Sequence, residues 1–262
     1  MNDRIITLDQ IPDDPLKMPP PYWRSGGAIF HILDSLTDLP ELLSNLLIVH
    51  ESTEIQLNEY YERHPNEPSS DDELQEFGEI CDDLWELEDK VKAKAELAIL
   101  MSAIQGEDFI NRFCIFNVHK DISESIESLS PAEKLLIASA AVGEKSTKGT
   151  AVYQAIKKLS TWRNAFAHGH CVDRPTKSLR HNHLISPSQY PGVPDTLAKM
   201  QELIGCFIKI DEYLRSISVN PYTAGKSVEV EEIKEQLKEI SAFKFIVSPE
   251  SNDIYDIEYD KT

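Results

Sequence analysis

SDDELQEFGEICDDLWELEDKVKAKAELA, residues 70–98, is the stretch that decides the fold class of this chain. It opens with Ser70-Asp71-Asp72-Glu73, a capping box in which a serine hydroxyl and a glutamate carboxylate each bind a backbone N–H at a helix start. Apolar side chains then recur at helical spacing in one stripe, which Glu88 interrupts: Leu74, Phe77, Cys81, Leu84, Val91, Ala95 and Ala98. The pattern predicts a long amphipathic helix that runs past residue 100, weakens at Gly106 and continues in helical style over 107–118.

Helical patterns also dominate the rest of the chain. A second capping box, Ser130-Pro131-Ala132-Glu133, has proline at the first helical position, where its missing N–H costs nothing. Besides the long helix, the predicted helices are 26–50 (continuing past Pro40), 131–143, 150–169, 197–217 and 228–240. Residues 243–247 are either a short strand or an extended docking segment. The fold class is therefore predicted to be all-α, a bundle of about six helices.

Composition divides the chain into three parts. Residues 1–22 contain five prolines and predict a leader that drapes on the surface, with Pro19-Pro20-Pro21 extended. Residues 23–220 form the helical domain, in which 61–70 is a break and 171–194 an irregular connection. Residues 221–262 are expected to be a charged helix followed by an acidic, mobile tail after Ser248.

Overall composition excludes several classes of protein. The 262 residues include 26 Lys and Arg against 45 Asp and Glu, and the net charge of −19 excludes a protein that coats nucleic acid non-specifically. A hydrophobic content of 41% is enough to bury a core and excludes a wholly disordered chain. There is no apolar run that could span a membrane and no signal-peptide pattern, and the four cysteines are too scattered for a disulfide framework. We expect a cytoplasmic protein with reduced thiols.

Residues 144–183 are basic although the whole chain is acidic. This window has only two anions, Glu144 and Asp173, and four of the eight histidines. Its cations are Lys145, Lys148, Lys157, Lys158, Arg163, Arg174, Lys177 and Arg180. A locally basic, histidine-rich segment in an acidic chain favours an anionic ligand at this place.

The motif Trp162-Arg163-Asn164-Ala165-Phe166-Ala167-His168-Gly169 lies inside the basic window. Asn164 and His168 are four residues apart and share a helix face, whereas Arg163 points about 100° away with a side chain long enough to reach round. His168 occupies the last helical turn, where the helix dipole favours the protonated imidazole, a form that can donate a proton to a leaving oxygen. Arg163 offers a planar fork for a phosphate.

At these residues the chain resembles the HEPN superfamily, α-helical domains of which many are metal-independent RNases. The family motif is Arg, four to six residues, then His, with a polar residue after the Arg, and Arg163, Asn164 and His168 match it. Glu107-Asp108-Phe109-Ile110-Asn111 resembles the polar stretch of the family's earlier long helix. In pattern, the resemblance covers about residues 74–217, and only the motif is specific.

The resemblance implies an endoribonuclease without metal or cofactor. Two protomers would pair so that both motif helices line one cleft, where the ribose 2′-hydroxyl attacks the scissile phosphate. His168 would transfer protons, Arg163 would stabilise the developing charge and Asn164 would orient the site. Lys157, Lys158, His170, Glu107 and Asn111 are the candidate substrate-binding residues. The expected partners are RNA (tRNA or mRNA), a second copy of the chain, and a neutralising or activating protein, in a toxin or anti-phage setting.

Three other interpretations stay open. The chain could be a non-catalytic helical binding or regulatory protein of the same fold. Arg163 could be a solvated helix cation and His168 a cap on the last carbonyls of its helix. A zinc site could form from His168, His170, Cys171, His181 and His183, although their spacing matches no familiar zinc finger.

Overall fold

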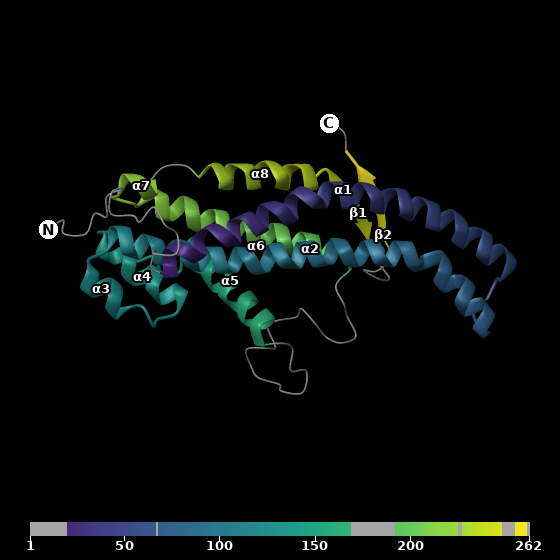
Figure 1. The fold of residues 1–262 in the computed structure, drawn as a ribbon, viewed down its shortest axis with the longest axis horizontal. Helices are drawn as coiled ribbons and strands as arrows, with labels where there is room; N and C mark the ends of the chain where they lie inside the picture. The colour runs from purple at the N-terminus through teal and green to yellow at the C-terminus, as the bar shows by residue number, and fades with distance from the viewer. Residues whose placement is uncertain (1–19, 67, 169–191, 225–226, 248–254, 261–262) are drawn as a thin grey trace.

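Two very long helices form the frame of the protein. The computed structural model describes residues 20–66, 68–168, 192–224, 227–247 and 255–260. In it, α1 (Pro20–Arg63) and α2 (Asp71–Asn117) lie side by side as a hairpin along the long axis (Figure 1). Helices make up most of the described chain and the only sheet in that part has two strands, so the all-α prediction is confirmed.

The start of α2 has the capping box that the sequence predicts. The Ser70 hydroxyl accepts from the Glu73 N–H at 3.2 Å, and the Glu73 carboxylate accepts from the backbone N–H groups of Ser69 and Ser70 at 2.9 and 3.1 Å. These bonds satisfy amides that have no partner within the helix. Because they stabilise the charged carboxylate, they lower the pKa of Glu73 from 4.5 to about 2.

We expect Glu73→Gln to lower the free energy of unfolding at neutral pH, because an amide oxygen accepts these hydrogen bonds more weakly than a carboxylate. A carboxyl group whose pKa is lower in the folded than in the unfolded protein stabilises the fold at pH values above its unfolded pKa. That contribution is lost as the pH falls through the folded pKa. The difference between wild type and variant should therefore shrink from pH 4.5 to about 2. Urea unfolding across this range measures it. Glu62→Gln, an exposed position on α1, is the control, and an equal pH dependence in both variants would contradict the prediction.

Gly106 lies within α2, and the helix continues through it. Its missing side chain allows three helices to approach closely. It is buried, and a Cβ there would lie 3.0 Å from Leu159 Cδ1 of α5 (Ala151–His168) and 3.7 Å from Ile210 Cδ1 of α6 (Val193–Ser216). The missing side chain thus permits the packing of α2 against α5 and α6. The helix continues to Asn117, as the helical pattern of 107–118 predicts.

We expect Gly106→Leu to destabilise the fold by about 1–3 kcal/mol, because the new side chain overfills this crossing. Gly78 provides a matched control on the same helix, since a Cβ there meets nothing within 4 Å. Gly78→Leu should be neutral or slightly stabilising, as leucine favours a helix more than glycine does. Chemical denaturation of both variants measures the difference, and equal effects would show that Gly106 is not needed for close packing.

The remaining helices complete the bundle around this frame. Helix α6 lies along α2, and α8 (Val228–Ile240) lies along α1, while α3 (Lys120–Ser125), α4 (Pro131–Ala141) and α7 (Pro221–Ala224) gather at one end (Figure 1). The second capping box is present at the start of α4, and α8 has the predicted bounds. Fully buried side chains of α1 face this core: Ile32, Leu36, Leu39, Leu43 and Leu46.

Two predictions about the ends of the chain are wrong in part. Helix α1 begins at Pro20, so Pro20 and Pro21 are helical rather than extended, since proline is compatible with the first turn of a helix. The predicted mobile tail contains β2 (Tyr255–Tyr259), which pairs antiparallel with β1 (Phe243–Val247). Its acidic composition hides an alternation in which Tyr255 and Ile257 are buried and Asp256 and Glu258 exposed. The strand alternative for 243–247 is confirmed.

None of the described helices is both long enough and apolar enough to cross a membrane. Cys81, Cys114 and Cys206 are buried free thiols, while Cys171 lies outside the described residues.

Candidate functional site

Helix α5 positions the first two motif residues. Its buried stripe of Val152, Ala155, Ile156 and Leu159 packs into the core. Arg163 follows Leu159 by one helical turn, so it leaves the helix on the same side but beyond the buried stripe. The Arg163 side chain is 31% exposed, which places the guanidinium at the edge of the core and within reach of solvent.

The structure brings Arg163 together with Glu107 of α2 as a direct ion pair. The same guanidinium donates to the Asn164 side-chain oxygen at 3.2 Å. Glu107 is 26% exposed, so the pair lies in a half-buried position between two helices. A carboxylate and an amide thus orient the guanidinium, while part of the Arg163 side chain stays exposed to solvent.

A second polar contact lies one turn further along α2. Asn111 accepts a hydrogen bond from Lys134 Nζ of α4 at 3.0 Å. Lys134 is only 7% exposed, and its charge also counteracts the burial that raises the pKa of Cys114 to about 11. Glu107 and Asn111 share one face of α2, so they form a polar strip to which α5 contributes Arg163 and α4 contributes Lys134.

Sequence reasoning did not single out Lys134 as a site residue. The signal that could have found it is its position among Pro131, Leu135 and Ala138, the buried stripe of α4. A lysine in an apolar stripe needs a polar partner, because burying an unpaired ammonium is costly. The sequence does not show which helix supplies that partner, so Asn111 becomes evident only in three dimensions.

The two candidate lysines of α5 are engaged with neighbours in their own chain. Lys158 forms an ion pair with Glu202 of α6, and this contact raises the pKa of Lys158. Lys157 is exposed, with its ammonium 5.9 Å from the centre of the Tyr153 ring. Since Lys158 is directed to α6 whereas Arg163 is directed to α2, the structure does not join Lys158 to the polar strip. A role for either lysine in binding substrate stays a prediction.

The histidines of the motif are only partly described. His168 is the last residue of α5, which confirms its predicted position on the final turn. Only its backbone is described, and its side chain lies outside the described set. His170 and the rest of the proposed zinc cluster, namely Cys171, His181 and His183, also lie outside the described residues. Trp162 is half-buried against the core, with Lys199 Nζ 5.5 Å from the centre of its ring.

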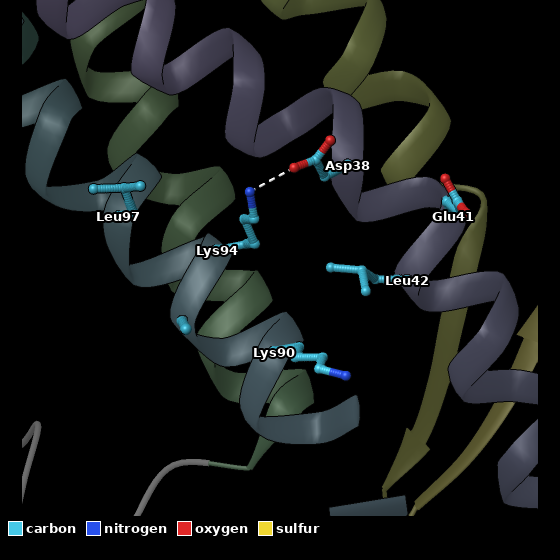
Figure 2. Close-up of a pocket in the computed structure, with 7 residues that line it drawn as sticks. Asp38, Glu41, Leu42, Lys90, Lys94 and Leu97 are labelled. Carbon is cyan, nitrogen blue, oxygen red and sulfur yellow. Dashed lines mark hydrogen bonds and ion pairs between the residues drawn. The ribbon is translucent and has the colours of Figure 1, made fainter. Parts of the chain in front are cut away.

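A groove between α1 and α2 lies apart from the motif residues. It encloses about 460 Å³ and is lined by Asp38, Glu41, Leu42, Lys90, Ala93, Lys94 and Leu97 (Figure 2). Lys94 forms an ion pair with Asp38 at 2.5 Å across the groove, and Lys90 pairs with Glu86 at 2.7 Å. Both lysines of the groove are thus paired with carboxylates of the chain.

Comparisons with family models, curated proteins and solved structures find no match to this chain. The resemblance to the HEPN superfamily therefore stays a prediction carried by the motif residues.

Proposed function

We propose that the chain is a metal-independent endoribonuclease of the HEPN type. The observation that supports this most directly is the placement of Arg163. Its guanidinium is held by Glu107 and Asn164 at the edge of the core, five residues before the histidine that ends α5. A pre-oriented arginine is a suitable group for a phosphate whose negative charge increases in the transition state.

The proposed reaction is transesterification of the RNA backbone. The ribose 2′-oxygen attacks the adjacent phosphorus, the bond from phosphorus to the 5′-oxygen breaks, and a 2′,3′-cyclic phosphate and a 5′-hydroxyl result. His168 takes part by transferring a proton to the leaving 5′-oxygen or from the attacking hydroxyl. Arg163 stabilises the charge on the non-bridging oxygens, and Asn164 holds the guanidinium in position.

The proposal includes a two-fold dimer in which each chain contributes Arg163 and His168 to one cleft. A shared cleft gives the phosphate two cations and two imidazoles, so that one histidine can act as acid and the other as base. With a net charge of −19 for the whole chain, RNA outside such a cleft would be repelled. The biological setting proposed is a toxin or anti-phage effector controlled by a neutralising or activating protein.

The ion pair itself favours a second candidate function, a non-catalytic helical binding or regulatory protein. Glu107 neutralises Arg163 within one chain, and a paired guanidinium can serve simply to join α2 to α5. In this alternative, the polar strip of Glu107, Asn111 and Lys134 contributes to the packing of three helices and binds no phosphate.

Incubation of the purified protein with end-labelled tRNA and a structured mRNA in excess EDTA tests the proposal. Cleavage with 2′,3′-cyclic phosphate ends is the expected result, because the reaction needs no metal. The 2′,3′-cyclic phosphate ends are identified by their resistance to direct 3′-end labelling and by mass spectrometry. Absence of cleavage of either RNA would favour the non-catalytic alternative.

A further inference from the structure

Three side chains that can ligate a metal converge where the C-terminal hairpin meets the long helix α1. They are His50 and Glu54 of α1 and Asp256 of β2, and their ligand atoms all lie within 4.8 Å of one another. Within the part of the chain that the structure describes, none of the three forms a hydrogen bond or a close ion pair through its side chain. Each therefore keeps a lone pair available to a cation.

The spacing of the three residues suits one ion. His50 and Glu54 are four apart on one helix face, and Asp256 approaches from the paired strand. An ion equidistant from three atoms 4.8 Å apart would be about 2.8 Å from each, against about 2.0–2.2 Å in a zinc site. Small side-chain rotations of Glu54 and Asp256, which are both exposed, would close this gap.

Neighbouring contacts hold two of the candidate ligands in place. The His50 ring stacks on the Tyr255 ring with centroids 5.5 Å apart. Tyr255 is buried and donates its hydroxyl to Glu88 of α2 at 2.5 Å. Since Asp256 is the next residue in β2, the same anchor fixes its backbone. Such outer contacts orient metal ligands and maintain the affinity of metal sites.

We propose that His50, Glu54 and Asp256 bind a zinc ion that fastens the C-terminal hairpin to α1. Zinc binds imidazole nitrogen and carboxylate oxygen, and these three protein ligands leave a fourth position for water. Two carboxylates and one neutral imidazole place a net negative charge around the cation. The site is separate from the proposed nuclease chemistry, which uses no metal, and the two proposals can fail independently.

Binding of ZnCl₂ to the full-length protein, measured by competition with a chromophoric chelator, tests this site. We expect one zinc per chain at this site, and a loss of affinity of at least about tenfold in His50→Ala and in Asp256→Asn. Glu258→Gln is the matched control, since Glu258 lies on the same exposed face of β2. It should bind zinc as wild type does.

A second variant separates this site from the histidines of the basic window. The triple variant His170→Ala/His181→Ala/His183→Ala should keep the zinc affinity of the site at His50. Amide exchange should slow in β1 and β2 when zinc is added, and EDTA should reverse the effect. Affinity unchanged by His50→Ala, loss of all binding in the triple variant, or absence of binding below about millimolar zinc would overturn the proposal.

Discussion

Replacing Arg163 with alanine is expected to lower RNA cleavage by about a hundredfold or more while the fold stays intact. Removal of one pre-oriented donor from a site of developing negative charge typically costs a factor of this size. The ion pair with Glu107 is partly solvated, with side chains 31% and 26% exposed. Such pairs contribute about 1 kcal/mol or less to stability, so a loss of activity would not reflect unfolding. Single-turnover cleavage and urea denaturation of the same preparation measure both quantities.

Three further variants make this test specific. Arg63→Ala is the matched control, because Arg63 forms a comparable ion pair with Glu76 at 2.7 Å on another part of the molecule. It should cleave as wild type does. Arg163→Lys should restore only part of the activity, since an ammonium lacks the planar fork. His168→Ala should lose a factor of about 10²–10⁴, the usual contribution of a positioned acid or base.

If both single variants, Arg163→Ala and His168→Ala, cleaved RNA as fast as wild type does, any nuclease activity would lie at another site. A non-catalytic role for the motif would instead show itself in stability. In that case, Arg163→Ala and Glu107→Gln would destabilise the protein equally, and the double variant would be no worse than either single one.

Replacing Asn117 with alanine is expected to destabilise the fold by about 2–4 kcal/mol. The Asn117 side-chain oxygen accepts from Ser218 Oγ at 2.8 Å, from the Val219 N–H at 2.9 Å and from the Asn220 N–H at 3.0 Å. Its amide nitrogen donates to Thr223 Oγ1 at 3.2 Å. One side chain at the end of α2 thus holds the turn between α6 and α7, and alanine would remove an acceptor of the half-buried Ser218 hydroxyl and Asn220 N–H.

Equilibrium unfolding of Asn117→Ala measures this effect, and Asn58→Ala at an exposed position of α1 is the control. Asn117→Asp should be intermediate, because aspartate keeps the acceptor for three donors and loses the donor to Thr223. A change below about 0.5 kcal/mol in Asn117→Ala, the size expected of an ordinary surface substitution, would show that water replaces these bonds without cost.

The helices could be predicted because their signals are local. Capping boxes at Ser70 and Ser130 specify two helix starts, and apolar periodicity specifies which face of each helix is buried. The second strand is not evident from the sequence because it lies in an acidic tail, and its pairing depends on contacts with β1.

The candidate site divides in the same way. The motif at the end of α5 and the polar residues Glu107 and Asn111 could be selected from the sequence, since residue type and spacing alone mark them. Their partners could not. That Glu107 meets Arg163, and that Asn111 meets Lys134, depends on how α4 and α5 cross α2.

Local chemistry in the chain therefore determines the all-helical class, the helix starts and the motif residues, because caps and periodicity act within a few residues of each other. Packing determines which distant residues meet: the close crossing at Gly106, the turn held by Asn117 and the meeting of His50 with Asp256. These contacts join residues many positions apart, and their formation depends on the burial of apolar surface by the whole bundle.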